Sequence, residues 1–192
     1  MDDRLASLLT TDSSRLAPHL HAPLQSGSDP VLRRMGRHWY DSTKYEQAVR
    51  RLTDNCPVFG LSADVMTGFP GERDEDHLAT LRLVERLPFT ALHVFPWSPR
   101  PGTSAVRLPD RVSGSLSRAR ASELRLLAGE KGAAYAAARA GGMCDVIITE
   151  RGKGLTEDYL SVSISDRTIP RRSRVRAVLR NLDGELVAFP YD

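Results

Sequence analysis

The stretch VFGLSADVMTGFPGERDEDHLATLRLVERLPFTALHVF, residues 58–95, contains a complete strand–helix–strand pattern. A strand-like run over residues 58–69 ends at Pro70-Gly71, a pair that favours a turn. The alternating run TALHVF, residues 90–95, is typical of a second strand. Two strands separated by a helix predict parallel pairing through a right-handed crossover, and therefore an α/β layer.

The helix expected between these strands begins with three carboxylates. Asp74, Glu75 and Asp76 crowd its first turn, where negative charge opposes the positive end of the helix dipole. Helical spacing of apolar residues predicts the face that turns toward the sheet. That face is expected to carry Leu78, Leu81 and Val84.

The same alternation extends toward the N-terminus. An apolar strand is expected over residues 20–24, and Asp29-Pro30 then begins a short helix capped by Ser28 or Asp29. A longer helix is expected to open near residues 42–43, where Thr43 and Glu46 fit a capping box. The order strand, loop, helix therefore repeats, which favours one parallel sheet over separate hairpins.

Three loops follow the three expected strands: QSGSD (25–29), TGFPGE (67–72) and PWSPRPGT (96–103). The carboxyl ends of parallel strands meet at one edge of a sheet or barrel, which is where such folds bind ligands. We therefore expect these loops to surround a common site.

The C-terminal part has a different period. A long Ala- and Arg-rich helix is expected over 110–140 and ends at Gly141-Gly142. Four short alternating strands follow, which predict a small closed or partly open β-barrel of the OB type. Two domains are thus expected, 1–142 and 143–192. The four strand sequences are CDVIITE, DYLSVSI, SRVRAVL and ELVAFP.

The composition is that of a globular chain, with 41% hydrophobic and 27% charged residues among 192. A net charge of +3 says little about nucleic acid, so local clusters must carry that argument. The two cysteines, Cys56 and Cys144, have neither a disulfide pattern nor a metal-ligand spacing. A reducing, cytoplasmic location is the expectation that follows.

The motifs PLQSGSDPVLRRMGR, DVMTGFPGE and HVFPWSPRPGT, in this order, resemble the second half of the radical S-adenosylmethionine (SAM) domain of methylthiotransferases. The tail ERGKGLTEDYLSVSI resembles the start of a TRAM domain, an RNA-binding β-barrel. The resemblance implies the C-terminal half of a (β/α) radical SAM barrel followed by a TRAM domain. HVFPWSPRPGT and GLTEDYL are most similar to the MtaB branch, which modifies N6-threonylcarbamoyladenosine in tRNA beside the anticodon.

The sequence departs from that family in its cysteines. The family holds a radical-generating [4Fe-4S] cluster with a CxxxCxxC motif and a second cluster with three further cysteines, and this sequence has neither set. The resemblance implies SAM and [4Fe-4S] as cofactors, with the cluster ligands outside this chain. We expect a truncated product, a fragment or a split protein that is inactive alone. A stand-alone RNA-binding protein, or a subunit that docks with a cysteine-bearing half, are the alternatives.

On the SAM side, each candidate residue has a second interpretation. The serines of the first loop fit a helix cap equally well, and the glycines and glutamate of the second loop fit a tight turn. Asp64 lies within a strand, so it is expected to face a polar partner in the barrel interior or an arginine such as Arg100. The residues that the resemblance places near SAM are Gln25, Ser26, Ser28, Asp64, Gly68, Gly71, Glu72, Phe95 and Pro96.

Two groups are candidates for RNA contact. Trp97 and Arg100 offer an aromatic ring and a guanidinium on a stiff loop, although a packed structural tryptophan fits as well. The barrel offers a cationic face for phosphates, with residues 172, 174 and 176 on one side of a strand. The alternative is a solvated face neutralised by Glu157, Asp158 and Asp166. The barrel candidates are Arg151, Lys153, Arg171, Arg172, Arg174 and Arg176, and the five histidines are expected to be structural.

Overall fold

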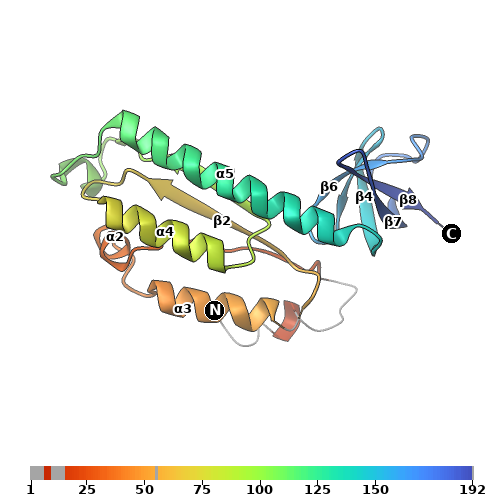
Figure 1. Cartoon of the computed structure of the whole chain (residues 1–192), viewed down its shortest axis with the longest axis horizontal. Coiled ribbons are helices and arrows are strands. Elements are labelled where there is room, and N and C mark those ends of the chain that lie inside the picture. Colours follow the sequence, from red (N-terminus) through yellow and green to blue (C-terminus); the bar gives the residue numbers. More distant parts are fainter. Residues whose placement is uncertain (1–6, 10–15, 55, 192) are drawn as a thin grey trace.

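The computed structural model describes residues 7–9, 16–54 and 56–191, which form an α/β layer with a β-barrel at one end (Figure 1). The sheet of the layer has three parallel strands in the order β1-β2-β3. The predicted parallel pairing is therefore confirmed. These strands are β1 (His19–His21), β2 (Gly60–Thr67) and β3 (Ala91–Pro96).

Strand β1 is shorter than the expected strand over 20–24. Its pairing with β2 ends at His21, and an isolated bridge between Gln25 and Val65 resumes the contact further on. Pro23 interrupts the ladder because it has no N–H to donate. The carboxyl ends of all three strands still meet at one edge of the sheet.

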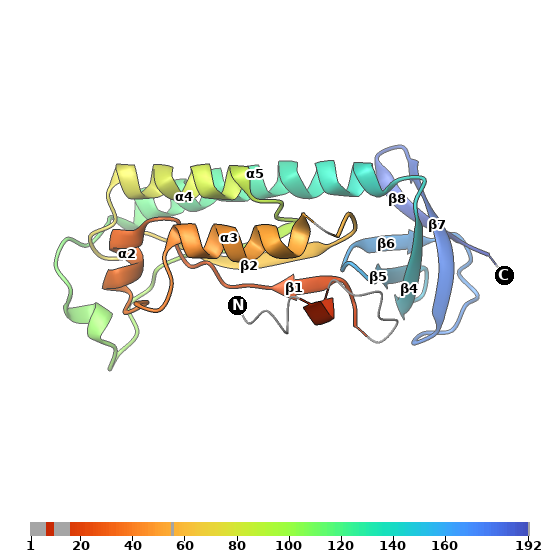
Figure 2. The ribbon, with the colours of Figure 1, turned by 90° about the horizontal axis from the view of Figure 1, so that it is seen from below.

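Helices cover one face of this sheet (Figure 2). Alternate residues of β2, such as Leu61, Ala63 and Val65, are fully buried beneath them, whereas Asp64 and Met66 on the other face are only partly buried. The core is thus one-sided within the described part of the chain. The helical elements are α2 (Asp29–Arg34), α3 (Ser42–Thr53), α4 (Asp74–Arg86), the 3-10 turn η1 (Ser104–Arg107) and α5 (Gly114–Arg139).

Two details of the helices differ from the sequence expectations. Helix α3 is capped by Asp41, whose carboxylate accepts from the Lys44 amide at 2.7 Å, and not by Thr43. In α4, Leu78 is 44% exposed, because the inward stripe contains the hydrogen-bonded polar residues Asp76 and Thr80. The expectation for Leu78 was therefore wrong. The cap of α2 is Ser28, as expected.

The C-terminal barrel is closed and has five strands in the order β4-β5-β6-β8-β7, one strand more than predicted. The missed strand, β5, has only four residues, and it includes Gly154. A Cβ on Gly154 would lie 2.3 Å from the Val146 side chain, so glycine is needed where these strands approach. The strands are β4 (Met143–Glu150), β5 (Lys153–Thr156), β6 (Ser161–Ile164), β7 (Arg174–Leu182) and β8 (Glu185–Pro190).

Helix α5 connects the sheet to the barrel, and the turn between β5 and β6 contacts both. Asp158 in this turn forms an ion pair with Arg139 of α5 at 2.8 Å. The Tyr159 ring stacks on His19 of the sheet, with a centroid distance of 3.8 Å. Sheet and barrel are therefore packed together through residues 157–159. Within the described ranges, no helix has the length and apolarity that crossing a membrane requires.

Candidate functional site

A cavity of about 390 Å³ lies at the carboxyl edge of the sheet. It opens where β1, β2 and β3 end, which is the position that the loop pattern predicted. Its volume is in the range of small-molecule sites. Six of the candidate residues line it: Gln25, Asp64, Phe95, Pro96, Trp97 and Arg100.

The lining divides into an apolar wall and a few polar groups. Phe69 and Trp97 meet edge to face, with 6.2 Å between ring centroids, and Phe95 lies on the same wall. Gln25 adopts a positive φ of 67°, a conformation that non-glycine residues rarely take. An aromatic wall beside an amide and a carboxylate suits a ligand with a planar base and a hydroxylated or charged tail.

Asp64 is positioned by histidine, not by Arg100. Its Oδ1 lies 3.5 Å from Nε2 of His21, whose Nδ1 lies 2.9 Å from the Ser62 hydroxyl. The His93 ring follows at 5.7 Å from that of His21. These side chains form a polar row on the uncovered face of the sheet, where His21 and His93 are exposed.

Two candidates of the first loop are instead engaged by α4. The Ser28 hydroxyl donates to Asp76 at 2.5 Å, and the Ser26 hydroxyl lies 3.3 Å from that of Thr80. Gly27 donates to the same threonine hydroxyl at 2.9 Å. Both serines are buried and neither lines the cavity, so their contact with SAM stays a prediction that this structure does not favour.

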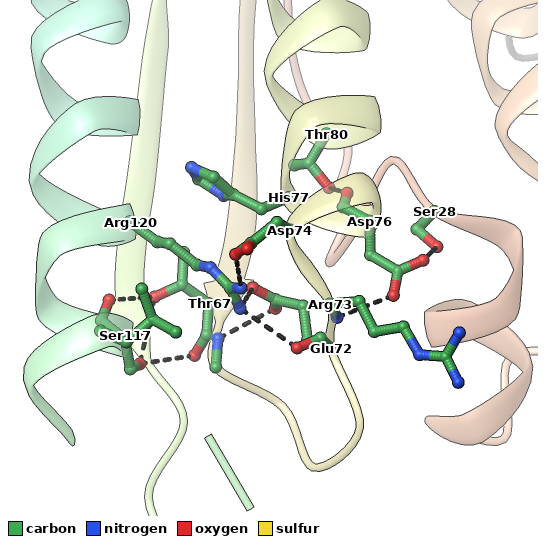
Figure 3. Close-up of polar contacts among 12 residues, drawn as sticks. Ser28, Thr67, Glu72, Arg73, Asp74, Asp76, His77, Thr80, Ser117 and Arg120 are labelled. Atoms are coloured by element: carbon green, nitrogen blue, oxygen red, sulfur yellow. Dashed lines mark hydrogen bonds and ion pairs between the residues drawn. The ribbon is translucent and has the colours of Figure 1, made fainter. Parts of the chain in front are cut away.

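Three candidates of the second loop are engaged by α5 and α2. Glu72 forms an ion pair with Arg120 at 2.8 Å, and its other oxygen accepts from the Gly68 amide at 2.9 Å (Figure 3). The carbonyl of Gly71 accepts from Arg34 at 2.5 Å. None of the three lines the cavity. The positive φ of Gly68 and Gly71, 71° and 81°, fits the tight turn that was the second interpretation of this loop.

Arg120 is a buried charged residue that the sequence analysis did not single out. It is 4% exposed, donates to Glu72 and also reaches Asp74 at 2.6 Å. Burial raises the pKa of Glu72, and the nearby guanidinium of Arg120 opposes that rise. A single arginine on an arginine-rich helix carries no local signal of such a role, because its partners lie 46 and 48 residues away.

The cationic candidates of the barrel do not form one cluster. Arg151, Lys153 and Arg172 lie at or beside the β4–β5 turn, whereas Arg176 lies opposite Asp145, near the start of β4. The Arg172 amide donates to Ile148 at 2.8 Å, and Lys153 pairs with Glu150 across that turn. Arg172 lies before β7 with a positive φ of 71°, so the expected strand alternation applies to Arg174 and Arg176 but not to Arg172. The carboxylate that neutralises the cations of β7 also differs from the expected Glu157, Asp158 and Asp166. Arg174 pairs with Asp145, whereas Asp158 pairs with Arg139 of α5.

Comparison with known proteins finds relatives whose names describe enzymes that add a methylthio group to modified adenosines of tRNA. "Threonylcarbamoyladenosine tRNA methylthiotransferase MtaB" of Thermotoga maritima is 45% identical over 58% of this chain and 25% of its own length. The protein of the same name from Treponema pallidum is 39% identical over 80% of this chain and 32% of its own. "tRNA-2-methylthio-N(6)-dimethylallyladenosine synthase" of Syntrophobacter fumaroxidans is 34% identical over 91% of this chain and 41% of its own length.

The chain is homologous to part of the tRNA methylthiotransferases. It spans between a quarter and about two fifths of the length of these relatives. The recognition of this family from the three loop motifs and the tail is confirmed. No family model matches the chain.

The methylthiotransferase homology raises the question of which cofactors these residues fit. The cavity at the strand ends offers a planar wall, an amide and a carboxylate, which fit SAM. The cysteines do not fit an iron–sulfur cluster. Cys56 lies beyond α3, whereas Cys144 is buried in the barrel, where burial raises the pKa of its thiol to about 12. Two thiols in separate parts of the fold cannot supply a cluster's ligands.

Proposed function

We propose that this chain is the part of a radical SAM tRNA methylthiotransferase that provides one side of the SAM pocket and the RNA-binding barrel. Residues 1–142 would be the C-terminal half of the (β/α) radical SAM barrel, and residues 143–192 the TRAM domain. The cavity shared by Gln25, Asp64 and Phe95 at the strand ends is the observation that carries the proposal. The methylthiotransferase relatives support the reaction class.

The substrate that the proposal favours is tRNA, at the N6-threonylcarbamoyladenosine beside the anticodon. Two relatives named for threonylcarbamoyladenosine support this choice, at 45% and 39% identity. SAM would supply radical and methyl chemistry when bound. The residues of this chain would orient it, with Asp64 and Gln25 binding polar groups while Phe95 and Trp97 exclude water from the base.

The cluster ligands would come from outside this chain, and the sheet supports that view. Its second face, which carries His21, Asp64 and Met66 by strand alternation, lies away from α3, α4 and α5 (Figure 2). The short edge strand β1 also leaves backbone groups that another strand can pair with. Docking with a cysteine-bearing half is therefore the second candidate arrangement, and inactivity of the chain alone is the expected behaviour.

We expect Asp64→Ala to weaken SAM binding about tenfold or more, because a hydrogen bond to a charged group contributes about 1.5–3 kcal/mol. Isothermal titration of the chain with SAM measures this. Glu75→Ala is the matched control, since Glu75 is an exposed carboxylate on α4 whose partner is Arg73. Equal affinity of the Asp64 variant and the control, or no binding by the unmodified chain, would contradict the proposed pocket.

For RNA, we expect tRNA affinity to fall steeply with salt through the cations of the barrel. The double variant Arg171→Gln with Arg176→Gln should reduce the slope of log K against log salt by about 2. Arg174 is a poorer choice because it pairs with Asp145. Arg180→Gln is the control, since its guanidinium packs over the Phe189 ring at 4.6 Å. An unchanged salt slope in the double variant would remove the barrel from the RNA interface.

A further inference from the structure

A second cavity, of about 590 Å³, lies on the other side of the segment that leads to Gln25. Its floor is formed by Ala22 and Pro23, which follow β1, and its wall by α3 and the loop before it. Ala22 and Gln25 are three residues apart, on the order of 10 Å of chain. The second cavity is therefore adjacent to the candidate cofactor site but separate from it.

The aromatic residues of this cavity have two different roles. Tyr45 and Tyr40 donate to the carbonyls of Ala22 and Leu24, at 2.6 and 2.8 Å, and burial raises the pKa of both phenols. They therefore stay neutral and hold the segment before Gln25 in place. Trp39, by contrast, is 68% exposed, so its indole offers an open stacking surface.

One cation lies near that open ring and two others line the same cavity. The guanidinium of Arg37 lies 5.6 Å from the Trp39 ring centroid, and Lys44 and Arg51 line the same cavity from α3. Among the described residues that line the cavity there is no carboxylate, although Asp41 lies 3.6 Å from the Lys44 ammonium. An exposed aromatic ring with neighbouring cations is the combination that binds a base and its phosphate in single-stranded nucleic acid.

We infer that the Trp39 cavity binds one unpaired nucleotide of the RNA, with the base stacked on Trp39 and the phosphate held by Arg37 and Lys44. The inference rests on the proposed function, because a tRNA substrate supplies the unpaired nucleotide. It adds a contact at the sheet, far along the chain from the barrel cations. A nucleotide held there would lie beside the Ala22–Gln25 segment, and so next to the site where SAM is proposed to bind.

The direct test uses Trp39 as its own reporter. The chain has two tryptophans, so Trp97→Phe leaves Trp39 as the single tryptophan, which is excited selectively over the tyrosines at long ultraviolet wavelength. Titration with a single-stranded hexamer of adenosine ribonucleotides should quench the Trp39 emission, and a stable GC-rich RNA duplex should quench it much less. No quenching, or equal quenching by duplex RNA or by an oligoglutamate peptide, would overturn the inference.

Affinity measurements on single variants complete the test. Trp39→Ala should weaken hexamer binding about tenfold or more, whereas Trp39→Phe should retain most of it, because stacking contributes about 1–3 kcal/mol per base. Arg37→Ala with Lys44→Ala should also weaken binding. Arg50→Ala, an arginine of α3 paired with Glu46 outside the cavity, is the matched charge control. Equal affinities of Trp39→Ala and the control would overturn the inference.

These outcomes separate the inference from the proposed function. If SAM binding depends on Asp64 but Trp39 is neither quenched nor needed for RNA binding, the inference fails and the proposed function stands. If Trp39 is quenched by single-stranded RNA but neither SAM nor tRNA binds as expected, the cavity is a nucleotide site and the proposed function fails.

Discussion

Arg120→Ala is expected to lower the free energy of unfolding by about 3–5 kcal/mol, because it leaves a buried carboxylate without its cation. The Arg120 guanidinium donates to Glu72 at 2.8 Å and to Asp74 at 2.6 Å, and its residue is only 4% exposed. The Glu72 carboxylate also accepts a hydrogen bond from the Gly68 amide at 2.9 Å (Figure 3). Loss of the ion pair would therefore also destabilise the loop after β2. Urea denaturation followed by circular dichroism measures the change.

The pH dependence of the expected stability loss in Arg120→Ala tests whether the unpaired Glu72 carboxylate causes it. Burial already raises the pKa of Glu72, and removal of Arg120 should raise that pKa further. A carboxyl whose folded pKa lies above its unfolded value destabilises the fold when charged, and this penalty disappears as pH falls through the folded pKa. The gap between Arg120→Ala and the unmodified chain should therefore shrink on acidification.

Two controls accompany this experiment. Arg118→Ala removes an exposed arginine from the same helix and should stay within about 0.5 kcal/mol of the unmodified chain. The double variant Arg120→Met with Glu72→Leu removes both buried charges and should recover much of the loss. A deficit of equal size in Arg118→Ala, or one that does not depend on pH, would show that the Arg120–Glu72 pair is not the source.

The layer of parallel strands could be predicted because buried strands of this kind have continuous apolar sequences bounded by strong turn signals. The run over 58–69 and Pro70-Gly71 is an example. Strand β5 was not predicted because its four residues, which include a glycine, are too few to show the alternation of apolar and polar residues that is typical of a strand. The inward face of α4 was partly wrong because buried Asp76 and Thr80 are held there by hydrogen bonds and not by apolarity.

The site could be predicted only to the level of strand ends. That rule correctly located the region of the cavity, which Gln25 and Asp64 line. It could not tell which loop side chains turn toward the helices instead, because this depends on partners distant in sequence, such as Thr80 for Ser26 and Arg120 for Glu72. Trp97 was assigned to RNA by residue type, whereas in the structure it lines the same cavity as Asp64.

Asp158→Ala is expected to have an effect of similar size, about 3–5 kcal/mol, at the junction of sheet and barrel. The Asp158 carboxylate is fully buried and accepts from Tyr135 at 2.6 Å, Arg139 at 2.8 Å and Thr156 at 2.5 Å. Its loss leaves the buried Arg139 guanidinium with Glu157 as the remaining side-chain partner among the described residues. Glu150→Ala, which removes an exposed carboxylate from β4, is the control.

The consequence should be a loss of cooperativity between the two parts of the chain. The Asp158 backbone is packed so tightly on the sheet that a Cβ on Gly60 would lie 2.2 Å from its carbonyl oxygen. With Tyr159 stacked on His19, this turn is the element that transmits unfolding from one part to the other. We expect one calorimetric transition for the unmodified chain and two for Asp158→Ala. A single transition in the variant would mean that α5 and the His19–Tyr159 contact couple sheet and barrel without the buried ion pair.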